Sequence, residues 1–115
     1  MSNQDYWIFD DSAETNRKYG CPPKDRSITE LLDSGIILVN KPSGPTSHQL
    51  TAWARDLLGL NRLGHGGTLD PFATGLLTLL CGRATKITNI VLNTNKSYIA
   101  VLKFANAITS KELEN

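Results

Sequence analysis

The chain has 115 residues, of which 40% are hydrophobic and 20% are charged. This length suits one small domain, and this composition is typical of a globular protein rather than of a disordered one. No apolar run approaches the length of a membrane span, and the first residues lack the basic and apolar regions of a signal peptide. The two cysteines, Cys21 and Cys81, have no metal-ligand spacing, so we interpret them as reduced thiols of a cytoplasmic protein.

The formal net charge of +1 conceals a separation of charge along the chain. Residues 1–34 carry seven acidic and four basic side chains, whereas residues 35–105 carry two acidic and seven basic ones. A basic middle segment suits a polyanionic partner such as RNA, but it is equally consistent with a solvated basic face. Arg83 and Lys86 in this segment are therefore predicted to meet either phosphate or solvent.

The N-terminal part of the chain divides into an arm and the start of a domain. Residues 1–27 are polar and contain the turn-forming sequence CPPKDR, so they are predicted to form an irregular arm. The domain is predicted to occupy 28–115. It begins with a short helix at 28–34, followed by a buried strand at 35–39, the apolar run GIILV.

A second helix is predicted over residues 48–58. Thr46 or Ser47 is suited to be its N-cap, and Gly59 is suited to end it. Its apolar residues recur at helical spacing, which indicates an amphipathic helix. Trp53 lies on this apolar stripe and is predicted to be part of the core rather than a residue that stacks on RNA.

Four further elements are predicted in the second half of the chain. The run LLTLLC, 76–81, indicates a strand, and the apolar spacing of 84–93 indicates a helix. Residues 96–104 alternate with both faces largely apolar, which predicts a well-covered strand. The sequence TSKE, 109–112, matches a capping box and predicts the start of a helix. These few strands would leave an open sheet edge, so we expect a truncated domain.

The stretch GHGGTLDPFATG, residues 64–75, places Asp70 after three closely spaced glycines and directly before a proline. Proline biases the preceding residue toward extended backbone, and Gly64, Gly66 and Gly67 can adopt positive φ and leave space for a ligand. The pattern does not match a P-loop, a dinucleotide-binding loop, a glycosidase carboxylate pair or a nucleophile elbow. Asp70 is therefore either a catalyst that acts without a metal or a structural Asp-Pro turn residue.

Three blocks of the sequence together resemble the TruB/dyskerin family of RNA pseudouridine synthases: GIILVNKPSGPTS, GHGGTLDPFATGLL and NKSYIAVL. They occur in the order found in the family, over about residues 27–105. The phrase KPSGPTSHQLTAW and the polar arm are similar to the archaeal and eukaryotic dyskerin branch, whereas PFATGLL is more similar to the bacterial form. The resemblance implies an α+β fold that forms part of the family's mixed-sheet catalytic domain.

The resemblance also implies a role for each matching residue. Asp70 matches the catalytic aspartate, which acts on a carbon of the target uridine while the glycosidic bond breaks, and no metal or organic cofactor is implied. His65 matches the histidine that helps to displace the target base, and Tyr98 matches the tyrosine that stacks on it. The other matching residues are expected to support the catalytic loop or to contact substrate RNA: Lys41, Gly44, Thr46, Ser47, Gly66, Gly67 and Thr68. On the structural alternative, His65 bonds within its loop and Tyr98 is an ordinary strand aromatic.

The implied function is the isomerisation of uridine to pseudouridine in tRNA, including its uridine-55 site, or in rRNA, or in both. In the dyskerin branch this takes place inside a box H/ACA particle, where a guide RNA selects the uridine and small accessory proteins join. Family members are longer: they continue with the rest of the catalytic domain, which supplies a basic partner for the aspartate, and with an RNA-binding PUA domain. The alternative is a catalytically silent fragment that binds RNA or assembles with a complementing chain.

Overall fold

The computed structural model describes residues 9–14, 16 and 18–113. Residues 1–8, 15 and 17 of the predicted arm, and residues 114–115 at the other end, lie outside the described residues. The elements follow in the order η1 (Pro23–Asp25), α1 (Ile28–Asp33), β1 (Ile36–Lys41), α2 (Ser47–Leu57), β2 (Leu63–His65), β3 (Gly75–Cys81), η2 (Gly82–Ile87), α3 (Thr88–Leu92) and α4 (Ser110–Leu113). This mixture of helices with a small sheet agrees with the predicted α+β class.

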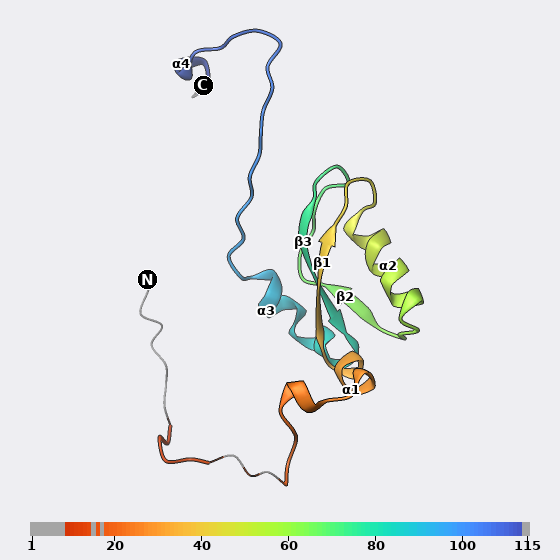
Figure 1. Ribbon diagram of the computed structural model, residues 1–115. Helices are drawn as coiled ribbons and strands as arrows, with labels where there is room; N and C mark the ends of the chain where they lie inside the picture. Colours follow the sequence, from red (N-terminus) through yellow and green to blue (C-terminus); the bar gives the residue numbers. More distant parts are fainter. Residues whose placement is uncertain (1–8, 15, 17, 114–115) are drawn as a thin grey trace.

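The three strands form one sheet in the order β1-β3-β2, and α2 lies on one side of it (Figure 1). β3 is central and pairs antiparallel with both neighbours, so the described sheet is antiparallel rather than mixed. The register places Lys41, at the end of β1, opposite Gly75, at the start of β3. His65 ends β2 and lies opposite Leu79. Lys41 and His65 therefore both adjoin the connection from β2 to β3, residues 66–74, which we call the Asp70 loop.

The core is centred on β3, and the strand predicted at 76–81 is confirmed. The strand predicted at 35–39 is also present, as β1, but its alternate residues Ile36 and Leu38 are 52% and 67% exposed. The expectation of a buried strand is therefore wrong for these two positions, because this face of β1 is not covered by any other described element. The buried side chains of β3 are Leu77, Leu79, Leu80 and Cys81.

Helix α2 has the ends that the sequence predicts. The hydroxyl of Thr46 accepts the N–H of Gln49 at 3.0 Å, and the side chain of Gln49 accepts the N–H of Thr46 at 2.9 Å. This reciprocal pair is a capping box, which satisfies two backbone donors that the first turn leaves free. Gly59 follows the helix with a φ of 62°, a left-handed conformation that glycine adopts without strain.

The buried face of α2 differs from the predicted one. Ser47 and Thr51 are buried, and the hydroxyl of Thr51 donates to the carbonyl of Ser47 at 2.7 Å. Trp53 is 60% exposed, so its predicted place in the core is wrong. The small side chains of the polar face allow α2 to approach β2 and the Asp70 loop closely, and this contact decides which face is buried.

The first and the last α-helix of the described chain, α1 and α4, are short and capped by side chains. α1 confirms the helix predicted at 28–34, and Ser27 and Glu30 form a capping box at its start. At α4 the carboxylate of Glu112 accepts the amide and the hydroxyl of Thr109 at 2.7 and 2.8 Å, which confirms the helix start predicted there. None of the helices among the described residues is long and apolar enough to cross a membrane.

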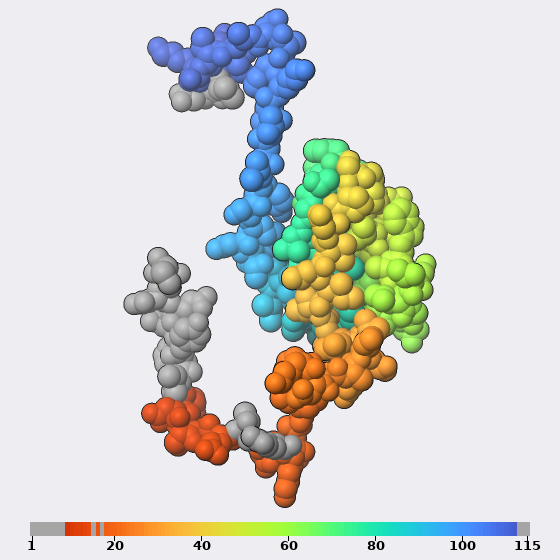
Figure 2. Space-filling model, viewed as in Figure 1, coloured from red at the N-terminus to blue at the C-terminus, as the bar shows by residue number. Residues whose placement is uncertain are grey.

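The segment after α3 departs most from prediction. η2 and α3 together cover the helix predicted at 84–93, but residues 95–104 form no strand. Figures 1 and 2 show this segment running beside the sheet without joining it. Ile99 and Val101 are 99% and 93% exposed, so the predicted well-covered strand is wrong. A strand requires a neighbour that accepts its hydrogen bonds, and no other part of the described chain offers one here.

Candidate active site

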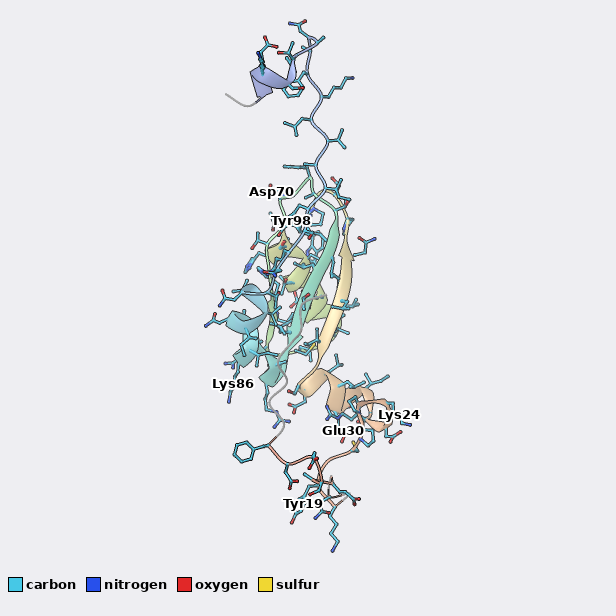
Figure 3. The ribbon with its side chains drawn as sticks, turned by 90° about the vertical axis from the view of Figure 1, so that its left-hand side faces the viewer. Tyr19, Lys24, Glu30, Asp70, Lys86 and Tyr98 are labelled. Atoms are coloured by element: carbon cyan, nitrogen blue, oxygen red, sulfur yellow. The ribbon has the colours of Figure 1, made fainter. Side chains whose placement is uncertain are left out.

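Asp70 lies at the first position of a tight turn in the Asp70 loop (Figure 3). Its carbonyl accepts the N–H of Ala73 at 3.0 Å, and Pro71 occupies the second position, where its fixed φ suits a turn. The backbone of Asp70 thus forms part of the turn. Its side chain is exposed, and it forms no hydrogen bond or ion pair with any residue that the structure describes. The carboxylate therefore remains available to a ligand.

Lys41 fixes the course of this turn. Its side chain is fully buried, and Nζ donates to the carbonyls of Asp70 at 3.1 Å, Pro71 at 3.1 Å and Ala73 at 2.9 Å. A fourth carbonyl, that of Pro42, lies 3.0 Å away, so the three ammonium protons are shared among four acceptors. A buried ammonium group requires such partners. Lys41 therefore supports the loop, and direct contact with RNA is wrong for a side chain that does not reach the surface.

Two more residues of the KPSGPTS motif bind the same loop. The hydroxyl of Ser47 accepts the N–H of Leu69 at 2.9 Å and donates to the carbonyl of Leu69 at 3.2 Å. Gly44 donates its N–H to the carbonyl of Pro71 at 2.7 Å and has a φ of 118°, which favours glycine. Ser47 is only 1% exposed, so it too supports the loop rather than contacting RNA. Thr46 contributes by capping α2, which places Ser47.

The loop glycines leave room for neighbouring side chains. Gly66 and Gly67 do not have positive φ, so that expectation is wrong, and the same holds for Gly64. A Cβ on Gly66 would lie 3.1 Å from Cβ of Val91 and closer still to its Cγ1. A Cβ on Gly67 would lie 3.3 Å from Cε of Lys96. Both glycines therefore allow α3 and the residues after it to pack against the Asp70 loop.

His65 is held by a contact within its own loop. Its Nδ1 lies 2.5 Å from the carbonyl of Gly67. Because a carbonyl can only accept, Nδ1 carries a proton in this contact, which leaves Nε2 of the neutral ring as an acceptor. His65 also lines a pocket of about 290 Å³ between α2 and β2, together with His48 and Arg55. His48 could not be identified from the sequence, because the pocket exists only where α2 packs against β2.

A groove of about 830 Å³ separates the Asp70 loop and the first half of β3 from residues 94–101. We call it the Tyr98 groove. Tyr98 and Phe72 line it and are 67% and 77% exposed, so two aromatic rings are available to a flat ligand. Gly67 and Thr68 also line it, and Figure 3 shows Asp70 and Tyr98 at the same end of the sheet. Phe72 was missed in the sequence, although an exposed aromatic next to an Asp-Pro turn is a usable signal.

The basic residues at the other end of β3 are distant from this groove. Arg83 belongs to η2 and forms an ion pair with Asp33 at 2.6 Å. Lys86, also in η2, lies toward the opposite end of the sheet from Asp70 (Figure 3). Neither side chain lines the Tyr98 groove. Across the described ranges, no three His, Cys, Asp or Glu side chains gather closely enough to hold a metal ion.

Comparison with known proteins connects this loop to one family. The sequence model of the TruB family pseudouridylate synthase (N terminal domain) matches residues 55–115, and that of the DKCLD (NUC011) domain matches residues 1–51. A probable tRNA pseudouridine synthase B of Methanopyrus kandleri is 44% identical over 102 residues, which cover 89% of this chain and 30% of the relative. The corresponding protein of Nanoarchaeum equitans is 42% identical over 113 residues, which cover 98% of this chain and 32% of the relative. The chain thus spans about 30% of the length of these relatives.

Solved structures agree with the sequence relatives. A chain in the structure of an H/ACA RNP bound to a substrate RNA containing 2'-deoxyuridine is 43% identical, with a TM-score of 0.67 over 73% of this chain and 26% of that one. A chain in the archaeal box H/ACA sRNP Nop10-Cbf5 complex is 48% identical, with a TM-score of 0.65 over 70% of this chain and 26% of that one. The archaeal relatives and the DKCLD match confirm the dyskerin-like branch. Since the TruB match covers more than half of the chain and includes Asp70, the chain belongs to the TruB/dyskerin family of pseudouridine synthases.

Proposed function

We propose that this chain is part of an enzyme that isomerises uridine to pseudouridine in RNA, with Asp70 as its catalytic residue. The observation that carries the proposal is the construction of the Asp70 loop. Lys41, Ser47 and Gly44 hold the backbone of the loop in one conformation, and the carboxylate stays exposed. Asp70 does not itself line the Tyr98 groove, but Leu69 on one side of it and Phe72 on the other side do. A fixed backbone with a free nucleophile is the arrangement that covalent catalysis requires.

The proposed chemistry needs no co-reactant. The bond between C1′ of the ribose and N1 of uracil breaks, and a bond between C1′ and C5 forms after the base turns. C5 loses its proton and N1 gains one, so substrate and product have the same atoms. The Asp70 carboxylate acts as nucleophile toward a ribosyl or base carbon while the first bond breaks.

The base must leave its stack before this chemistry can begin. We assign Tyr98 to hold the flipped uracil, since stacking on an aromatic ring contributes roughly 1–3 kcal/mol per base. We assign His65, whose ring is fixed by Gly67, to the displacement of the base, and Gly67 and Thr68 to the wall of the groove that faces RNA.

The proposed substrates are tRNA or rRNA, and the proposed partners are a guide RNA and small H/ACA accessory proteins. The names of the relatives, tRNA pseudouridine synthase B, support the first, and the similarity to chains from H/ACA particles supports the second. The positive charge available to a polyanionic ligand comes from Arg62, Lys86 and Lys103, whose side chains are exposed and form no hydrogen bond or ion pair with the described residues. We further propose that the enzyme acts in the cytoplasm and that 28–115 forms part of its catalytic domain, preceded by the arm 1–27.

A catalytically silent role in RNA binding or assembly is the second candidate. One observation favours it: the Asp70 carboxylate faces no cationic side chain within the described part of the chain. An aspartate without a preorganised electrostatic partner is a poor catalyst. The family resemblance implies that such a partner comes from elsewhere in the catalytic domain.

Release of tritium from RNA labelled at C5 of uridine tests both candidates. It is measured for this chain alone and for the chain combined with the C-terminal part of an archaeal relative and a guide RNA. Release that Asp70→Asn abolishes and Asp56→Asn preserves supports the synthase, because Asp56 lies on α2, where its charge is paired with Arg55. Turnover by Asp70→Asn contradicts the assignment of Asp70, and RNA binding without release in either arrangement supports the silent role.

A further inference from the structure

Lys96 connects α3 to the segment that carries Tyr98, and no function described above includes it. We propose that Lys96 is a positioning residue, which holds Tyr98 beside the Asp70 loop. The proposal rests on the proposed function, because that function assigns the stacking role to Tyr98. The property that the proposal concerns is different, however. It is the conformational rigidity of the backbone around Tyr98, which can be measured without RNA.

The ammonium group of Lys96 binds the end of α3. Nζ donates to the carbonyls of Val91 at 3.1 Å, Leu92 at 2.8 Å and Thr94 at 3.1 Å. The last carbonyls of a helix have no partner within it, and a cationic side chain at that end is favourable. These contacts use all three ammonium protons, so the geometry gives Lys96 an internal role instead of a phosphate contact.

The stem of the same side chain reaches the Asp70 loop. A Cβ on Gly67 would lie 3.3 Å from Cε of Lys96, so the stem occupies the space beside this glycine. Val91, whose carbonyl Lys96 binds, occupies the space beside Gly66 in the same way. Lys96 therefore joins three parts of the molecule: α3, the two glycines of the Asp70 loop and the start of the extended segment.

Tyr98 follows Lys96 by two positions. In extended backbone, residues two apart lie on the same side, and Lys96 and Tyr98 both line the Tyr98 groove. Ile99, directly after Tyr98, is 99% exposed, so its side chain adds no packing contact that could hold Tyr98. Lys96 is consequently the residue through which the position of Tyr98 depends on α3 and on Gly67. The spacing of lysine and tyrosine in NKSY is the sequence signal for this role.

Lys103 provides a matched control, since it carries the same charge on the same segment. It is exposed and forms no hydrogen bond or ion pair with the residues that the structure describes. Lys103→Met removes one positive charge without removing an anchor. Lys96→Met removes the charge together with three hydrogen bonds, and Lys96→Arg keeps donors that can reach the carbonyls.

The first measurement is the heteronuclear ¹H–¹⁵N NOE of the full chain without RNA. Lys96→Met is expected to lower the NOE of residues 97–101 while the amides of β1 and β3 stay unchanged. Lys103→Met is expected to leave both groups unchanged. Equal values in wild type and Lys96→Met overturn the proposal whether or not the chain binds RNA, so its failure is distinct from a failure of the proposed function.

The second measurement is binding to a short single-stranded RNA that contains uridine, followed by fluorescence anisotropy. Tyr98→Ala and Lys96→Met are each expected to weaken binding about ten-fold, the order of one lost stacking contact, and the double variant is expected to bind no more weakly than Tyr98→Ala. Lys96→Arg is expected to retain most of the affinity, and Lys103→Met to change it less than about two-fold. If the fold losses of RNA affinity in the two single variants multiply in the double variant, Lys96 acts independently of Tyr98 and the proposal is overturned.

Discussion

Replacement of Lys41 by methionine is expected to lower the free energy of unfolding by about 3 kcal/mol. Lys41 is fully buried, and its Nζ lies 2.9–3.1 Å from four carbonyls. A hydrogen bond that involves a charged group contributes about 1.5–3 kcal/mol, and a carbonyl left without a donor costs about 1–3 kcal/mol. The carbonyls of Asp70 and Pro71 keep the N–H groups of Ala73 and Gly44 as donors, so the second cost falls on the carbonyls of Pro42 and Ala73. Burial of an apolar side chain and relief from burying a charge offset part of this sum.

Urea denaturation followed by circular dichroism measures this loss. With a slope of about 1–3 kcal/mol per molar urea, the midpoint is expected to fall by about 2 M. Lys103→Met is the matched control and is expected to remain within about 0.5 kcal/mol of wild type, since it is exposed and has no partner among the described residues. A Lys41→Met variant within about 1 kcal/mol of wild type would refute the argument that the carbonyl contacts stabilise the loop.

Three more outcomes are expected. Asp70→Asn abolishes tritium release but leaves the urea midpoint unchanged, because the side chain is exposed and unpaired within the described residues; a clear loss of stability would show that Asp70 is structural. Gly66→Ala costs about 1–3 kcal/mol by crowding Val91, whereas Gly64→Ala, whose new Cβ meets nothing closer than 3.5 Å, costs less; the reverse order in urea denaturation would contradict this packing. Burial raises the pKa of the Cys81 thiol above its ordinary value of 9.0, so the free energy of unfolding falls as pH rises from that value toward the folded-state pKa. If the stability of Cys81→Val declines with pH as much as that of wild type, Cys81 is not the cause.

Elements with local signals could be predicted from the sequence. The start of α2 depends on Thr46 and Gln49, three positions apart, and its end depends on Gly59 alone. The burial of its faces could not be predicted in this way. The periodicity that contains Trp53 identifies an apolar stripe, but only the approach of β2 and the Asp70 loop determines which face is covered. The segment 96–104 has a strand's alternation, but a strand also depends on a neighbour elsewhere in the chain.

In the candidate site, too, features with a local sequence signal could be predicted, whereas features that depend on distant residues could not. Asp70 could be identified as a candidate from the glycines and the proline around it, and the family resemblance gave it a role. The support for its loop could not be predicted, because Lys41 lies 29 to 32 positions away from the carbonyls of Asp70 and Ala73 that it binds. The purpose of Gly66 depends in the same way on Val91, which a distant helix places beside it.

Lys41 binds the Asp70 loop through backbone carbonyls alone, and every residue type supplies such a carbonyl. The course of the turn is therefore insensitive to the identity of side chains that point away from it. Phe72, which is 77% exposed within this turn, can be exchanged for another residue while the carboxylate next to the turn proline keeps its place. The exposed side chains of this turn can consequently change over evolution one at a time, without rebuilding the backbone contacts that hold Asp70 in place.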